Sequence, residues 1–285
     1  MNKKYLTISI LLLMLLSIPV FQATEQSYGQ FDQEIISDQG LQDSLFTVFA
    51  EYATTSWCPN CPTASAALKE VKQSTEQSFQ YITLVSDLND IARERSRIGF
   101  FNVAIPSVYV DGGYRQQIGG SQTVPATADI YRDLIAESAS RNSRYSLSVQ
   151  TEVAWLGDAE LEISISVTND EPSFYIGIVR SYITEIVSRW NDFSGEPYGY
   201  TMLDYAIKKP IFLRPDETKT FVQRWDGKED HSGLTFADIT QDNIMVQTAV
   251  YHWKPTLKSG YQSDTYNQRY LAFYVDQSDH AVPTE

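Results

Sequence analysis

The chain has 285 residues, of which 42% are hydrophobic and 20% charged, and this ordinary globular composition argues against general disorder. Its formal net charge of -14 excludes nucleic acid as an expected partner, because phosphate binding needs clustered Lys and Arg side chains. The length is sufficient for two domains, each with its own hydrophobic core.

The first 23 residues are predicted to be a signal peptide. Lys3 and Lys4 form a basic start, and a nearly unbroken apolar run follows from residue 6 to residue 21. This run is short for a membrane-spanning helix, which needs about 20 residues, and Ala23 suits cleavage. We therefore expect an exported, extracytoplasmic protein. An uncleaved membrane anchor stays the alternative, because the cleavage site is not a clean A-x-A sequence.

Residues 24–43 are polar and are predicted to form a linker, and residues 44–142 then alternate between strand-like and helix-like stretches. The run LFTVFAEYA predicts a strand that is buried on both faces. The elements expected after it are a helix from Cys61, a strand at 81–85, a helix at 89–101, a strand, turn and strand at 106–118, and a helix around 130–135. Strands that alternate with helices predict a central mixed sheet flanked by helices, an α/β fold.

Residues 143–285 are predicted to form an all-β domain. The stretch LEISISV at 161–167 alternates strictly between apolar and polar residues, which is typical of a strand with one buried face. Further strand-like runs are YSLSVQTEV, SFYIGIVRSYITEIV, DNIMVQTAVYHW and YLAFYVD, with turn residues between them. Several strands of this kind favour an immunoglobulin-like β-sandwich.

The only two cysteines, Cys58 and Cys61, lie in the stretch TTSWCPNCP, between the first predicted strand and the first predicted helix. Cys58 is therefore expected at a helix N-terminus, where unpaired backbone N–H groups and the helix dipole favour a thiolate. The thiolate is the attacking species in disulfide exchange, and Cys61, one turn further on, can resolve a mixed disulfide. Trp57 and Pro59 shape the surface around Cys58, which makes them candidate substrate-binding residues.

The spacing of the two cysteines is also compatible with two alternatives to a reactive dithiol. A purely structural disulfide is the first, although so short a loop restricts the unfolded chain little. A metal site is the second, but zinc requires four ligands, and His231, His252 and His280 lie in the other predicted domain. We therefore predict a redox-active pair, with no metal and no cofactor.

The segment 44–140 resembles the thioredoxin superfamily. The resemblance rests on the hydrophobic strand, the W-C-x-x-C motif, the strands and helices that follow, and the stretch AIPSVYVDG at 104–112. In that family a cis-proline precedes the third strand of the sheet and faces the dithiol, and Pro106, preceded by Ile105, is the matching position. The resemblance implies that this segment pairs with a bound peptide, so Ile105 and Pro106 become candidate substrate-binding residues.

The layout of the whole chain resembles secreted thioredoxin-like proteins with a C-terminal β-sandwich. In thioredoxins a buried acid in the first strand helps to move the proton of the second cysteine, and Glu51 is the acid of this strand. Tyr52, however, and not Glu51, occupies the position of this acid when residues are counted back from Cys58. The alternative is that Glu51 pairs with a lysine near the strand end.

The expected function is an exported thiol–disulfide oxidoreductase that acts through Cys58 and Cys61 on protein or peptide thiols and disulfides, together with an unidentified redox partner. The alternative is an extracytoplasmic binding or adhesion protein, in which the β-sandwich binds a partner and the thioredoxin-like domain is a scaffold. The direction of exchange stays open, because Pro59 resembles the oxidants of the family whereas Ile105 resembles the reductants.

Overall fold

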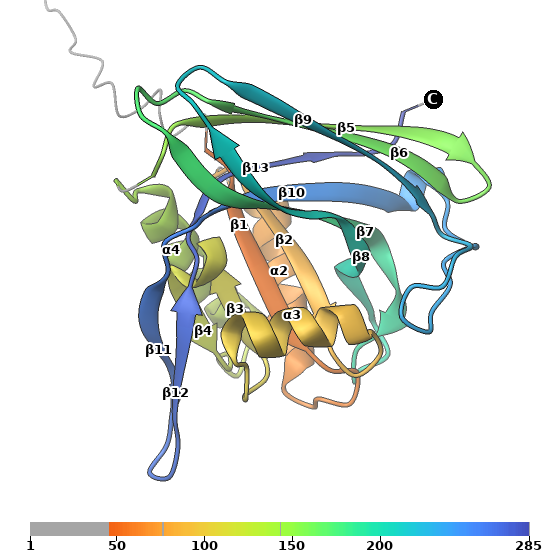
Figure 1. Ribbon diagram of the computed structural model, residues 1–285. Helices are drawn as coiled ribbons and strands as arrows, with labels where there is room; N and C mark the ends of the chain where they lie inside the picture. Colours follow the sequence, from red (N-terminus) through yellow and green to blue (C-terminus); the bar gives the residue numbers. More distant parts are fainter. Residues whose placement is uncertain (1–45, 76, 143, 285) are drawn as a thin grey trace, which may run out of the picture. The chain divides into compact units, whose positions relative to one another are not determined.

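Strands outnumber helices in the computed structural model, which describes residues 46–284 apart from residues 76 and 143 (Figure 1). The predicted signal peptide, residues 1–23, and the predicted linker, residues 24–43, lie outside the described residues. The helices are α2 (Cys61–Ser74), α3 (Asp90–Phe100) and α4 (Val124–Ala139), with short 3₁₀ turns at Asp111–Gly113 and Gln241–Asn243. The strands are β1 (Val48–Thr54), β2 (Phe79–Val85), β3 (Ser107–Val110), β4 (Arg115–Ile118), β5 (Leu147–Gly157), β6 (Glu160–Asn169), β7 (Tyr175–Asn191), β8 (Pro197–Leu213), β9 (Thr218–Asp226), β10 (Ile244–His252), β11 (Thr256–Gln262), β12 (Asn267–Ala272) and β13 (Val275–Ala281).

Eight of these strands form one sheet, in the order β13-β10-β7-β8-β2-β1-β3-β4. β1 and β2 run parallel, whereas β3 pairs with β1, and β4 with β3, in the antiparallel direction. β5, β6 and β9 form a second, three-stranded sheet. β11 and β12 form a hairpin that extends downward in Figure 1.

Helices cover both faces of β1 and β2. Ala50 and Tyr52 of β1 belong to a core that includes residues of α2 and α4, whereas Phe49 belongs to a core that includes Ala92 of α3. All seven residues of β1 are buried, which explains why its sequence is apolar at consecutive positions instead of alternating.

The first turn of α3 is fixed by Asn89. Its side-chain oxygen accepts hydrogen bonds from the backbone N–H groups of Ile91 and Ala92, at 2.9 and 3.2 Å, as a helix cap. Its amide nitrogen donates to the backbone carbonyls of Met202 and Leu203 in β8, at 3.0 and 2.8 Å. One buried side chain therefore starts the helix and connects it to the second half of the chain.

A large apolar core lies between the three-stranded sheet and the strands β7, β8 and β10. The alternating residues Leu161, Ile163, Ile165 and Val167 of β6 are all fully buried in it. The strict alternation in the sequence of this strand therefore corresponds to one buried face, as predicted.

The expected fold class, a thioredoxin-like α/β fold followed by a separate immunoglobulin-like sandwich, is wrong. β7, β8, β10 and β13, all from the second half of the chain, extend the same sheet as β1 to β4. β8 meets β2 at the parallel pair of Thr83 and Thr201, and the Thr83 hydroxyl donates to the Gly199 carbonyl at 2.7 Å. The physical reason is that the backbone N–H and C=O groups along the free edge of β2 need a partner strand. The alternation of apolar and polar residues shows which face of a strand is buried, but it does not show which strand lies beside it.

The turn between β3 and β4 is a second contact between the two halves. Gly112 has a φ of +66°, and a Cβ atom there would lie 1.8 Å from the backbone oxygen of Phe273. Only glycine fits so close an approach in this left-handed conformation. The pair Gly112-Gly113, which predicted a turn, is therefore also a point of packing against the C-terminal strands.

The order of elements from Val48 to Ala139 agrees with the order predicted from the sequence, and the five strand-like regions of the second half coincide with β5, β6, β7, β10 and the β12–β13 region. β8, β9 and β11 were not predicted. The domain boundary between residues 142 and 143 stays a prediction. Within the described chain, no helix has the length and apolar character needed to cross a membrane.

Candidate functional site

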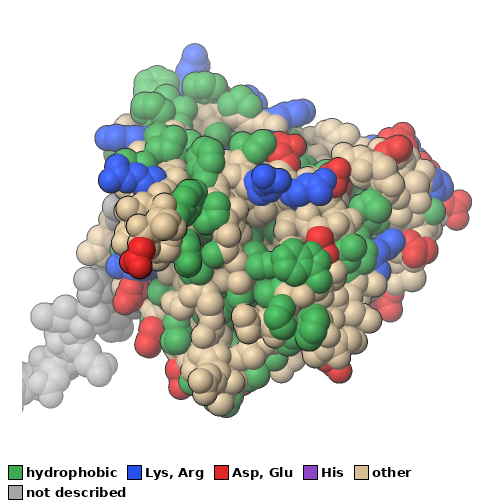
Figure 2. Space-filling view, turned by 90° about the horizontal axis from the view of Figure 1, so that it is seen from below, with side chains coloured by type: hydrophobic (Ala, Val, Ile, Leu, Met, Phe, Trp, Pro, Cys, Tyr) green, Lys and Arg blue, Asp and Glu red, His purple; other side chains and the backbone are tan. Residues whose placement is uncertain are grey.

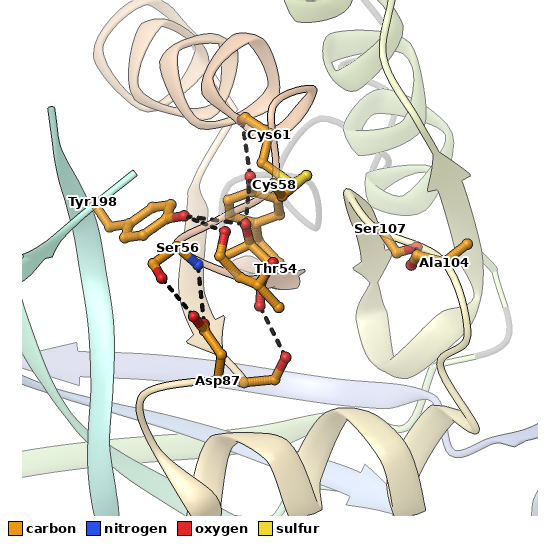
Figure 3. Close-up of a disulfide and its surroundings, with 11 residues drawn as sticks. Thr54, Ser56, Cys58, Cys61, Asp87, Ala104, Ser107 and Tyr198 are labelled. Atoms are coloured by element: carbon orange, nitrogen blue, oxygen red, sulfur yellow. Dashed lines mark hydrogen bonds between the residues drawn. A yellow bond between two sulfur atoms is a disulfide. The ribbon is translucent and has the colours of Figure 1, made fainter. Parts of the chain in front are cut away.

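The two cysteines form a disulfide at the point where β1 gives way to α2. Cys61 is the first residue of α2, and the Cα atoms of Cys58 and Cys61 lie 5.4 Å apart. The loop is closed by two backbone hydrogen bonds, from the Cys58 N–H to the Thr55 carbonyl and from the Cys61 N–H to the Cys58 carbonyl, both at 3.3 Å. Figure 3 shows the disulfide between the end of the first strand and the first turn of the helix.

The disulfide is largely covered, but the loop around it is open to solvent. Cys58 is 3% exposed and Cys61 is fully buried, whereas Trp57 is 63% exposed and Pro59 is also exposed. Cys58 is thus the cysteine nearer to solvent, as its place at the strand-to-helix corner predicts. Trp57 and Pro59, the chain neighbours of Cys58, are therefore the exposed part of this loop next to the disulfide.

Two buried tyrosines support the loop from below. The Tyr52 hydroxyl donates to the Cys61 carbonyl at 3.0 Å, and the Tyr198 hydroxyl donates to the Thr55 carbonyl at 3.0 Å. The Thr54 hydroxyl lies 3.3 Å from both tyrosine hydroxyls, so the three side chains are connected (Figure 3). Burial raises the pKa of Tyr52 well above its usual value and that of Tyr198 to about 12, so both remain neutral donors near pH 7.

The start of the loop is attached to the end of β2. The Ser56 backbone N–H donates to Asp87 Oδ1 at 3.0 Å, and the Ser56 hydroxyl donates to Asp87 Oδ2 at 2.5 Å. The Ser86 hydroxyl donates to the Thr54 carbonyl at 3.0 Å. These contacts bind the backbone of Thr54 and Ser56 to the segment that follows β2.

Pro106 lies at the same edge of the sheet as the disulfide. Its peptide bond to Ile105 is cis, as predicted. Ser107, the next residue, is opposite Ala53 in the antiparallel pairing of β3 with β1, and the strand β1 continues from there into the cysteine loop. Figure 3 shows Ala104 and Ser107 across from the disulfide, where the Ser107 hydroxyl donates to the Ala104 carbonyl at 2.6 Å. Pro106 itself is buried and Ile105 is half-buried.

Glu51 does not lie with the cysteines. It is fully buried on the face of β1 that α3 covers, whereas Cys61 and α2 lie on the face that carries Tyr52. Its two oxygens accept hydrogen bonds from Arg95 Nε and Nη2, at 2.5 and 2.6 Å. The hydroxyls of Tyr182 and Tyr251 complete the cluster at 3.3 and 3.2 Å. Among the described residues, Glu51 has no hydrogen bond or ion pair with Cys61 or with a lysine, because its carboxylate is already paired with Arg95.

Sequence reasoning missed the residues that support the disulfide. Tyr52 occupies the position at which counting back from Cys58 places the buried acid of thioredoxins, and this position was the only indication that it lies near the disulfide. Tyr198 had no signal, because it lies 143 residues from its partner Thr55 and comes from a strand that was not predicted. Asp87 follows a predicted strand, but a lone aspartate at a strand end is common in turns.

Exposed apolar side chains lie at the end of the sheet that carries the disulfide. Trp57 stands beside the disulfide, Leu88 follows β2, and Val103 precedes the Pro106 turn, so all three extend from the same sheet edge. Figure 2 shows hydrophobic side chains gathered on one face, with Lys and Arg side chains between them. Apolar side chains gathered in this way are typical of surfaces that bind other molecules.

The part of the chain that the structure describes contains no group of three or more His, Cys, Asp or Glu side chains arranged to hold a metal ion.

Comparison with known proteins gives a likeness of fold. No protein family model and no curated protein matches the chain. Among solved structures, HBP35 of Porphyromonas gingivalis has a TM-score of 0.59 at 11% sequence identity, over 84% of this chain and 76% of that protein. A protein from Agrobacterium tumefaciens has a TM-score of 0.48 at 12% identity, over 85% of this chain and 96% of its own. A GH3 β-glucosidase from Bifidobacterium adolescentis has a TM-score of 0.28 at 10% identity, over 49% of this chain and 17% of its own. The first likeness concerns the fold alone, and the TM-scores of the other two are too low to indicate a shared fold.

Proposed function

We propose that the chain is a thiol–disulfide oxidoreductase that acts through Cys58 and Cys61 on protein or peptide thiols and disulfides. The observation that carries the proposal is the Cys58–Cys61 disulfide at the N-terminus of α2, across from the turn that contains Pro106. The N-terminus of a helix favours the thiolate form of a nearby cysteine through its free N–H groups and its dipole, and Cys58 lies two residues before the N-cap residue Asn60. The resemblance of W-C-x-x-C and AIPSVYVDG to the thioredoxin superfamily gives further support.

The exchange transfers two electrons in two steps. The Cys58 thiolate attacks one sulfur of a substrate disulfide, forms a mixed disulfide, and releases the other substrate sulfur as a thiolate, which takes up a proton. Cys61 then loses its proton and attacks the Cys58 sulfur, which restores the Cys58–Cys61 disulfide and releases the second substrate thiolate. The same steps in reverse oxidise a substrate dithiol.

Four residues are proposed to bind the substrate. Trp57 and Pro59 flank the disulfide and are exposed, so they offer an apolar surface to a peptide. Ile105 and Pro106 supply the backbone beside which an extended peptide is expected to lie, as the family resemblance implies. Glu51 takes no part in the exchange, because it lies on the opposite face of β1 from Cys61.

The proposed place of action is outside the cytoplasm. Residues 1–23 support export, and a disulfide between the only two cysteines is in keeping with an oxidising compartment. A membrane anchor in place of a cleaved signal stays the alternative.

The test uses the reduced protein and two single variants. At mildly acidic pH, iodoacetamide should modify Cys58 far faster than Cys61, because a stabilised thiolate reacts where an ordinary thiol near pKa 8.5 does not. C61S should trap mixed disulfides with client proteins, whereas C58S should trap none. Equal and slow labelling of both thiols would instead favour a binding protein with an inert disulfide.

The reduction potential of the pair decides the direction of exchange. It can be measured by equilibration with glutathione buffers, and comparison with the potential of the compartment separates an oxidant from a reductant. W57A serves as a matched probe of substrate binding: it should slow reaction with a peptide disulfide while leaving the potential unchanged.

A further inference from the structure

A cavity of about 290 Å³ lies between α3, β7, β8 and the C-terminal end of β12, away from the disulfide. One wall is apolar and is formed by Ile98, Phe101, Leu271 and Phe273. The lining also includes Glu94 and Arg95 of α3, and Arg180 and Lys208, which are adjacent across β7 and β8. The cavity therefore combines apolar and charged side chains.

Arg180 is the unusual residue of this cavity. Its guanidinium lies 4.4 Å from the centre of the Tyr251 ring, and its Nε and Nη1 atoms are enclosed by the protein. Among the described residues, neither atom has a hydrogen-bond partner, and the guanidinium has no ion-pair partner. Arg180 as a whole is only partly buried, so its charge can be reached at Nη2, while Nε and Nη1 leave the guanidinium poorly solvated.

The other charges around the cavity are already balanced. Arg95, which lines it, is paired with Glu51 at 2.5 Å, and Lys208 is paired with Glu94 at 3.3 Å. Tyr205, also in the lining, is neutral near pH 7, because burial raises its pKa to about 12. One positive charge, that of Arg180, is therefore left uncompensated.

We infer that this cavity binds a small organic monocarboxylate with an apolar body, the chemistry of a short fatty acid. The carboxylate meets the Arg180 guanidinium through Nη2, the nitrogen that the protein does not enclose, in a charge-assisted hydrogen bond. The apolar body lies against Phe101 and Leu271. A phosphate dianion fits less well, since one uncompensated positive charge balances one negative charge. The cavity volume is at the lower end of the range for small-molecule sites, which favours a short chain.

Calorimetric titration of the whole protein with octanoate tests the inference, with octan-1-ol as a neutral probe of the same length. Octanoate should bind at least tenfold more tightly than octan-1-ol. R180M should weaken octanoate binding at least tenfold and leave the weak binding of octan-1-ol unchanged. R214M, an exposed arginine outside the cavity, should bind octanoate as the unmodified protein does.

A second variant keeps the test decisive if R180M does not fold. Lys208 is an exposed residue at the rim, so K208E should fold, and the added negative charge should weaken octanoate binding several-fold without affecting octan-1-ol. Replacement of both cysteines by serine should leave octanoate binding unchanged, which separates this site from the proposed redox function. Absence of octanoate binding at millimolar concentration, or equal affinity for the acid and the alcohol, would overturn the inference.

Discussion

The ion pair of Glu51 and Arg95 shows how a residue that is conspicuous in the sequence can have a partner that the sequence does not indicate. Glu51 interrupts an apolar strand, and this interruption was visible in the sequence. Its partner was not, because Arg95 lies 44 residues away in α3. The carboxylate is bound at both oxygens, and Arg95 also lies 4.4 Å from the centre of the Phe100 ring.

We expect E51Q to lower the free energy of unfolding by about 3–5 kcal/mol, because it leaves the buried Arg95 charge without its counterion. Chemical denaturation with urea measures this change. E137Q, in the exposed pair with Arg115, is the matched control and should change the stability by about 0.5 kcal/mol or less. If E51Q instead keeps its stability and slows release of a mixed disulfide, Glu51 acts as a proton relay after all.

A second residue-scale prediction concerns Asp276 and pH. Burial raises the pKa of Asp276 to about 6, against the opposing effects of Arg141 and of the hydrogen bond from the Tyr175 hydroxyl. The folded protein therefore holds a proton that the unfolded chain releases near pH 4. The resulting stability is fully present below about pH 4 and is lost as the pH rises through about 6, by an amount on the order of 3 kcal/mol.

The measurement is the stability of the unmodified protein minus that of D276N, taken from pH 4 to pH 7. This difference should fall as the pH rises across that range. D264N, in the exposed turn of the β11–β12 hairpin, is the control and should follow the pH profile of the unmodified protein. A difference that does not change with pH would contradict the prediction.

At the scale of elements, β8 is the strand that sequence patterns missed and that the site depends on. It delivers Tyr198 to the disulfide loop and Gly199 and Thr201 to the edge of β2. Its pairing with β7 shifts register at three places, so apolar residues do not recur at every second position. A search for strict alternation detects β6, which is regular, and overlooks β8.

Y198F should therefore lower the free energy of unfolding by about 0.5–1.5 kcal/mol, the usual net value of one buried hydrogen bond. It should also speed reduction of the Cys58–Cys61 disulfide by dithiothreitol, because the Thr55 carbonyl loses its donor and the loop is held less firmly. Y200F is the matched control on the same strand, since no hydrogen bond of the Tyr200 hydroxyl is present among the described residues. Equal reduction rates in the two variants would show that Tyr198 does not position the loop.

At the scale of the whole molecule, the sequence predicted local structure well and the pairing of distant strands poorly. The position of the cysteine pair, the cis bond at Pro106 and the order of elements up to Ala139 all follow from short stretches of sequence. The single continuous sheet could not be predicted in this way. The pair of Thr83 and Thr201 joins residues that are far apart in the chain and carry no distinctive local pattern.

This difference has a direct test in a fragment. Residues 44–142 alone should fail to form a stable fold, because β2 loses β8 at its edge and Asn89 loses the carbonyls of Met202 and Leu203. Near-ultraviolet circular dichroism and urea denaturation of the fragment should show no fixed tertiary packing and no cooperative transition. A cooperative transition would support the predicted boundary between residues 142 and 143 as that of an autonomous domain.

The contacts of Glu51 also constrain how relatives of this chain can diverge. Two of its partners, Tyr182 and Tyr251, belong to β7 and β10, whereas Glu51 and Arg95 belong to the first half. A lineage that lost the β-rich half would expose the Glu51 and Arg95 pair and remove the two hydroxyls that complete it. In such lineages we expect the position of Glu51 to change together with that of Arg95, and in lineages that keep both halves we expect all four positions to vary as one unit.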